Sequence, residues 1–134
     1  MNRKRLLVLA GVALAAAVII LAVLEVHAYR QKLARSRLID REHCARIKKG
    51  MSHAEVEAIL GGPPGDFRTA FVDYWMSPRL PPPDGGRMED WLGNGGAISV
   101  AFDEQGVVRW RGFFEANTLS LAEWVQDWLR RVWP

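Results

Sequence analysis

Three side chains beyond the apolar N-terminal segment could act as soft metal ligands or as acid–base groups: His43, Cys44 and His53. A zinc site normally pairs its ligands at spacings of two to four residues, and this chain has no such pairing. His43 and Cys44 are adjacent, so they point apart on any regular element. The same geometry argues against Cys44 as a nucleophile with either histidine as its base. We therefore expect no metal site and no cofactor.

Acidic and glycine-rich motifs give no stronger sign of catalysis. The pairs Glu89–Asp90 and Asp103–Glu104 consist of neighbours whose carboxyl groups diverge, which is unsuitable for paired acid–base work. The glycine-rich run 93–96 lacks the following helix and the lysine that a phosphate-binding loop uses, so we interpret it as a turn. The sequence predicts no catalytic residue, no enzyme and no small-molecule substrate.

The six tryptophans are more numerous than a small core uses. Two of them belong to an apolar stripe near the C-terminus, which either packs on a sheet or forms a docking face for lipid or a partner helix. A third follows as an added anchor, and a fourth lies near a proline-rich loop. These candidate partner or lipid contacts are Trp124, Trp128, Trp133 and Trp91.

The placement of these residues depends first on an apolar N-terminal segment. Leu6–Leu24 contains no charge, and 19 residues of helix span about 28 Å, close to the thickness of the hydrocarbon layer. We predict a basic tail at residues 1–5 and a transmembrane helix at 6–28, in contact with membrane lipid. A signal peptide cleaved after Ala28 is the alternative, although the apolar run exceeds the usual length for one.

Charge is distributed unevenly along the chain, whose net charge is +3. Residues 29–49 hold eight Lys and Arg against two acids, whereas residues 50–134 hold seven against twelve. The predicted domain is therefore acidic, which argues against nucleic-acid binding. We interpret 29–45 as a basic juxtamembrane connector. By the positive-inside rule alone, its charge would place the domain in the cytoplasm.

Residues 46–134 are predicted to form one small α+β domain. Ser52 and Glu55 form a capping box, with Met51 and Val56 as a hydrophobic staple, and Gly61 ends the helix that they begin. A second capping box at Ser120 opens an amphipathic helix at 120–132 whose stripe includes Trp124 and Trp128.

Between these helices, aromatic and β-branched residues predict strands. Residues 67–75 form one strand with Phe71 inward, 77–87 form a loop, and 88–92 could add a strand. Ile98, Val100 and Phe102 alternate toward a turn at 103–106, after which Val108, Trp110 and Phe114 are expected to continue the buried face. The fold class is thus α+β, with an N-terminal transmembrane helix and a two-layer domain of helices on a three-stranded or four-stranded antiparallel sheet.

The segment from Ile47 to Pro63 resembles the opening signature of the BamE (SmpA/OmlA) family of small bacterial envelope proteins. Asp73–Trp75 and 98–108 resemble, more loosely, the first strand and last hairpin of that family. The resemblance implies helices against a three-stranded antiparallel sheet and a non-enzymatic role beside the outer-membrane β-barrel assembly machinery. The residues that match the motif, and that we expect to be structural, are Gly50, Met51, Ser52, Glu55, Val56, Leu60, Gly61 and Pro63.

The chain also departs from the family. Family members carry a lipid-modified cysteine, whereas Cys44 follows Arg41–Glu42–His43 in the wrong context. Because the family functions outside the cytoplasm, the resemblance favours a single-pass inner-membrane protein with a periplasmic domain. Our leading hypothesis is a non-catalytic envelope domain that binds a protein partner or supports envelope assembly. The alternative is a membrane-surface module whose tryptophan-rich C-terminal helix engages lipid or a partner helix.

Overall fold

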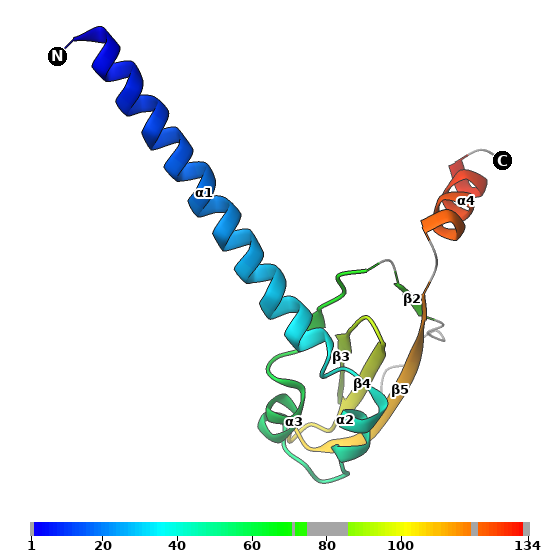
Figure 1. Cartoon of the computed structure of the whole chain (residues 1–134). Helices are drawn as coiled ribbons and strands as arrows, with labels where there is room; N and C mark the ends of the chain where they lie inside the picture. The colour runs from blue at the N-terminus through cyan, green and yellow to red at the C-terminus, as the bar shows by residue number, and fades with distance from the viewer. Residues whose placement is uncertain (1, 71, 75–85, 119–120, 133–134) are drawn as a thin grey trace. The chain divides into compact units, whose positions relative to one another are not determined.

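A computed structural model describes residues 2–70, 72–74, 86–118 and 121–132 of the chain (Figure 1). Phe71, Trp75, Ser120, Trp133, the proline-rich segment 77–85 and the side chain of Trp124 lie outside the description. The chain divides into two compact units, residues 1–31 and residues 32–134.

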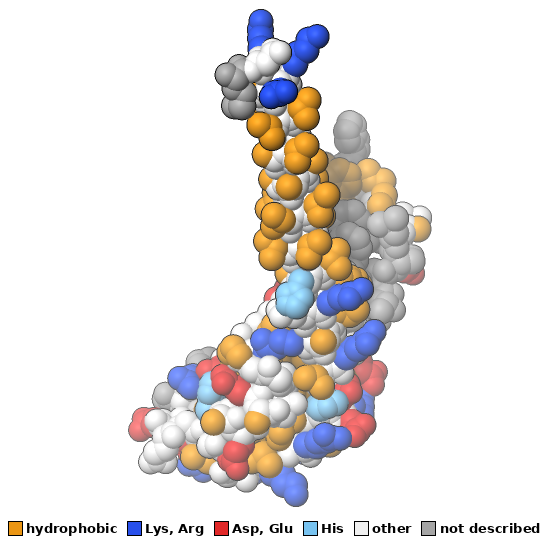
Figure 2. All heavy atoms as spheres, turned by 60° about the vertical axis from the view of Figure 1, so that its left-hand side comes forward, with side chains coloured by type: hydrophobic (Ala, Val, Ile, Leu, Met, Phe, Trp, Pro, Cys, Tyr) orange, Lys and Arg blue, Asp and Glu red, His pale blue; other side chains and the backbone are white. Residues whose placement is uncertain are grey.

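The first unit consists of most of helix α1, Arg3–Ser36. Its apolar side chains are exposed, and Figure 2 shows them on every visible side of the helix, with Lys and Arg beyond both ends of the apolar stretch. By length and composition, α1 can cross a membrane, and none of its most apolar window is buried as the core helix of a soluble protein would be.

The second unit contains a mixed sheet rather than the purely antiparallel one that we expected. Strands β3 (Arg87–Leu92), β4 (Gly96–Phe102) and β5 (Val108–Thr118) form an antiparallel meander. The short β1 (Gly65–Asp66) adds parallel to β3, and β2 (Val72–Tyr74) pairs antiparallel with the far end of β5. The strand order is β1-β3-β4-β5-β2.

Two short helices lie before the sheet in the chain, and their ends follow from the sequence. In α2 (Arg41–Arg46), the carboxylate of Asp40 accepts a hydrogen bond from the His43 N–H at 2.7 Å. In α3 (His53–Leu60), the predicted capping box is confirmed, because Ser52 and Glu55 bond to each other's backbone N–H groups. Gly61 ends α3 in the left-handed conformation, with φ of 80°.

The core lies where α2 and α3 meet the sheet. It also draws on Ile39, which precedes α2, and on the end of α1, where Ser36 is buried. The domain therefore begins earlier than residue 46, because the predicted connector 29–45 contributes core residues and the compact unit starts at Lys32. The buried core residues are Ile39, Cys44, Ile47, Val56, Leu60, Trp91, Ile98, Val100, Phe102 and Val108.

A register shift in the β4–β5 hairpin corrects one prediction. Phe102 pairs with Val108, whereas the preceding Ala101 pairs with Trp110, so an extra residue is accommodated between them. Successive residues of a strand point to opposite sides of the sheet. The extra residue therefore turns Trp110 and Phe114 to the side opposite the one that we predicted. Phe113 packs against the core instead, and Trp110 is 46% exposed.

The last described element is helix α4, Leu121–Val132. Its apolar residues fall on one face, as the sequence predicts. The four members of this stripe whose side chains are described are exposed: Val125, Trp128, Leu129 and Val132.

Candidate partner-binding surface

An open hollow of about 410 Å³ lies where the segment after α2 meets β5. It is lined by one tryptophan, three basic side chains and one buried apolar residue, which are Trp110, Lys48, Lys49, Arg111 and Ile47. Tryptophan and arginine dominate the binding energy of protein interfaces, because each combines a large contact area with polar groups. We refer to these five residues as the Trp110 surface.

The position of Trp110 is fixed by a glycine two residues further along β5. A side chain at Gly112 would collide with the Trp110 indole ring, so the ring lies over the space that a Cβ would occupy. Glycine at this position therefore allows the ring to lie close to the strand while leaving it about half exposed.

Arg111 is held on the other face of β5 by the end of α2. Its Nη1 donates to the backbone oxygen of Cys44 at 2.6 Å and lies 3.6 Å from the Cys44 Sγ. Cys44 itself is a free cysteine that is buried in the core, where it packs as a small apolar side chain.

A second polar cluster links α3 to β3. The Nε2 of His53 lies 2.5 Å from a Glu89 carboxylate oxygen, and its Nδ1 lies 3.4 Å from Glu57. Arg87 contacts the other Glu89 oxygen at 3.0 Å, and the imidazole ring packs on Phe102. Both ring nitrogens face carboxylates, and the cluster joins α3 to β3.

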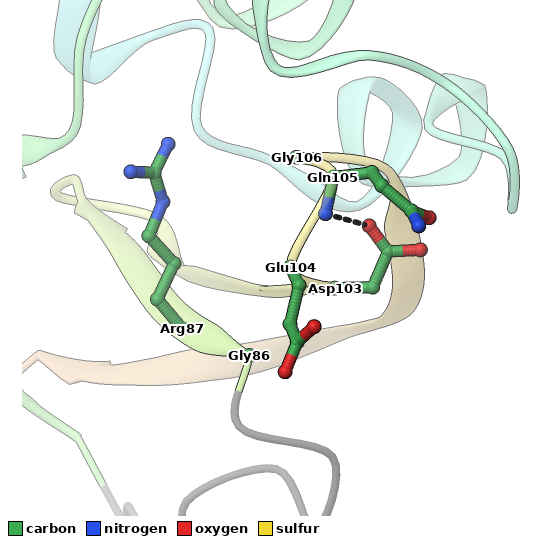
Figure 3. A pocket seen from close by; sticks show the side chains of 6 residues that line it. All are labelled: Gly86, Arg87, Asp103, Glu104, Gln105 and Gly106. Atoms are coloured by element: carbon green, nitrogen blue, oxygen red, sulfur yellow. Dashed lines mark hydrogen bonds between the residues drawn. The ribbon is translucent and has the colours of Figure 1, made fainter.

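The hollow in Figure 3 lies beside the hairpin turn and has a volume of about 380 Å³. The Asp103 carboxylate accepts hydrogen bonds from the N–H groups of Gln105 and Val107, which stabilise the turn. In Figure 3 the side chains of Arg87, Asp103 and Glu104 point in different directions.

Of the histidine and acidic residues singled out in the sequence, the fold brings His53 and Glu89 together. His43 bonds to Asp40 through Nδ1 at 2.7 Å, and His53 lies in its own cluster. Glu89 pairs with Val100 and Asp90 with Ser99 across the strands, so the two carboxylates occupy opposite faces. Among the described residues, no group of three or more His, Cys, Asp and Glu could hold a metal ion.

Two carboxyl groups near the end of α1 have lowered pKa values. Burial acts to raise the pKa of Asp40, but hydrogen bonds and the charge of His43 lower it overall. The pKa of Asp66 is lowered chiefly by its side-chain hydrogen bond with Arg68, against a smaller effect of burial. Asp40 caps α2 and Asp66 bonds to Arg68. The pKa of neither carboxyl group is raised, as the pKa of a general acid would be.

The tryptophans predicted as contacts have different outcomes. Trp91 is fully buried and donates from Nε1 to the Gly62 oxygen at 3.0 Å, so it belongs to the core and not to a contact surface. Trp128 is exposed on α4. Trp110 was not expected as a contact, because the alternation of β5 alone does not reveal the bulge. In the sequence, only its neighbours Arg109, Arg111 and Gly112 could have indicated that Trp110 is exposed.

Comparisons with protein-family models, curated proteins and solved structures found no match to this chain.

Proposed function

We propose that the chain is a membrane-anchored, non-catalytic domain that binds a protein partner through the Trp110 surface. Helix α1 supplies an anchor of suitable length and composition. The polar clusters around His53 and Asp103 are engaged in holding the fold together, which supports binding rather than catalysis.

The exposure of Trp110 beside three basic side chains is the observation that carries this proposal. An exposed indole that could have been buried is costly in water, and its burial against a partner recovers that free energy. Lys48, Lys49 and Arg111 line the same hollow as the indole, Arg111 from the opposite face of β5, and they add positive charge there. We therefore infer that the partner presents an acidic segment with an apolar side chain that covers the indole.

The resemblance of residues 47–63 to the BamE family supports a more specific role. We propose that the domain is an envelope-assembly accessory and that it faces the periplasm from a single-pass inner-membrane anchor. The charge of residues 29–49 favours the opposite orientation, so orientation requires its own measurement. A reporter fused after Pro134 is expected to be active in the periplasm, and cytoplasmic activity would remove the assembly role.

Site-specific photocrosslinking in cells tests the binding surface. A benzophenone amino acid replaces Trp110 in the full chain, and in a matched variant it replaces Glu104 on the exposed hairpin turn. We expect a discrete crosslinked species from position 110 that is absent from position 104.

Charge reversal provides the second half of this test. Lys48→Glu with Lys49→Glu should weaken the crosslink from position 110 several-fold, because opposed charges on the rim become like charges. An equal yield from positions 110 and 104, or no effect of the charge reversal, would count against the Trp110 surface.

A further inference from the structure

We infer that helix α4 lies in the membrane–water interface, with its apolar stripe in contact with lipid. The described part of this stripe consists of Val125, Trp128, Leu129 and Val132, which are between 38% and 55% exposed. These positions follow a spacing of three and four residues, so they share one face of the helix. The described chain therefore leaves this face uncovered.

The composition of α4 distinguishes it from α1. In α1, apolar residues cover all sides, as in a helix that crosses a bilayer. In α4, Glu123, Gln126 and Arg130 occupy the opposite side from the apolar stripe, at 100° per residue. An amphipathic helix with a strongly polar face and low overall hydrophobicity lies along the interface instead of crossing it.

Its residue types also suit the interface. Tryptophan is enriched at the headgroup level, where the ring is accommodated with its N–H toward water.

The size of the stripe favours lipid over a second protein surface. A helix of 12 residues is about 18 Å long, and one face is roughly 10 Å wide. This area is far below the approximately 800 Å² per partner of a stable protein interface. A lipid contact can be weaker, because an anchor in the same chain holds the bilayer at a high effective concentration.

The inference rests on the proposed membrane anchoring but not on the proposed partner. The test uses the full chain in phosphatidylcholine–phosphatidylglycerol vesicles, with an environment-sensitive fluorophore on a cysteine introduced by Leu129→Cys. Gln126→Cys places the same probe on the polar face. Cys44 is buried, which limits its competition for the label under native conditions. Nitroxide-labelled acyl chains in the vesicles then quench probes that contact lipid.

We expect quenching at position 129 at least about twofold greater than at position 126, because the interfacial helix buries its apolar face at the acyl boundary. Adding Val125→Glu to the Leu129→Cys chain should abolish the difference, whereas adding Gln126→Glu should leave it intact. Because α4 belongs to the same chain as the anchor, the readout does not depend on which way the protein inserts.

Flotation of the same vesicles tests membrane anchoring separately from the interfacial position of α4. If the chain floats and the two probes are quenched equally, the interfacial position of α4 is wrong while anchoring stands. If the chain does not float, both are wrong. A probe at position 129 that is shielded from water but not quenched by lipid would show that α4 packs on protein, which also overturns the inference.

Discussion

At the scale of single residues, Ser52 and Glu55 account for where α3 begins. The Ser52 hydroxyl accepts the Glu55 N–H, and the Glu55 carboxylate accepts the Ser52 N–H. Two N–H groups that have no partner within the helix are thereby bonded, and a pattern of four residues was sufficient to predict this.

Ser52→Ala tests the cap directly. We expect the free energy of unfolding to fall by about 1 kcal/mol, because the Glu55 N–H loses its acceptor. Urea unfolding of the full chain in detergent micelles measures this difference. Ser52→Asn is the matched control and should retain most of the stability, since asparagine also caps helices; equal losses for both variants would contradict the role of the cap.

Glu55 makes the stability of the fold depend on pH, and the direction of its pKa shift gives the sign of this dependence. Hydrogen bonds with the Ser52 N–H and hydroxyl hold the pKa of Glu55 below its ordinary value. A lowered folded-state pKa means that the carboxylate stabilises the fold above the unfolded-state pKa, about 4.3, and that this contribution is lost as pH falls through the folded-state pKa.

We therefore expect Glu55→Gln to be less stable than the parent chain at pH 7, and the difference to shrink as pH falls below about 4. Unfolding curves of both proteins between pH 7 and pH 3 measure it, with Glu104→Gln on the exposed turn as the control. A difference that stays constant over this range would show that the capping carboxylate does not titrate as inferred.

At the scale of elements, the end of α1 is joined to the end of α3. The Arg35 guanidinium donates to the Pro63 oxygen at 2.7 Å and stacks 3.9 Å from the Phe67 ring centre. Leu38 lies close to Gly61, where an added Cβ would be 2.7 Å from the Leu38 Cδ1. The last turn of α1 is thus part of the folded domain.

Gly61→Ala and Gly106→Ala form a matched pair that isolates this contact. Both glycines have positive φ, 80° and 76°, but a Cβ at Gly106 would meet nothing within 4 Å. We expect both variants to lose about 1 kcal/mol or more from backbone strain, and Gly61→Ala to lose more because Leu38 must move. Urea unfolding measures the free energy of unfolding of both variants. Equal losses would show that the contact with Leu38 does not affect stability.

The sequence predicted those elements whose boundaries are determined by the residue types at their ends. The cap at Ser52, the stop at Gly61 and the hairpin around Asp103–Gly106 were all identified in advance. The two residues of β1 carry no periodicity, so their parallel pairing with β3 could not be anticipated. The exposure of Trp110 depends on the bulge, and the burial of Ile39 and Cys44 depends on packing between distant segments.

At the scale of the whole molecule, the chain combines an apolar helix with a domain whose core starts at the end of that helix. The described residues of the first unit are all exposed, and their helix is long and apolar enough to cross a membrane. The second unit carries the sheet and its core.

The intact mass of the protein extracted from membranes tests the anchor. We expect it to include residues 1–28, because the apolar run is longer than that of a typical signal peptide. We also expect the chain to resist extraction by alkaline carbonate. A mature chain that begins at Tyr29 would identify the segment as a cleaved signal and would contradict membrane anchoring through α1.

The outer edge of β5 has a consequence for how copies of this protein meet. Between Arg109 and Glu115, the described strands pair with β5 on the β4 side, and β2 joins its other side only from Ala116 onward. A bare strand edge is a template for amyloid-like growth or for dimers that continue a sheet. Here Arg109 pairs with Asp103 and Arg111 donates to the Cys44 oxygen. Together with the neighbouring bulge they bring basic side chains and an irregular backbone to that edge, which are features that disfavour strand addition by a second copy.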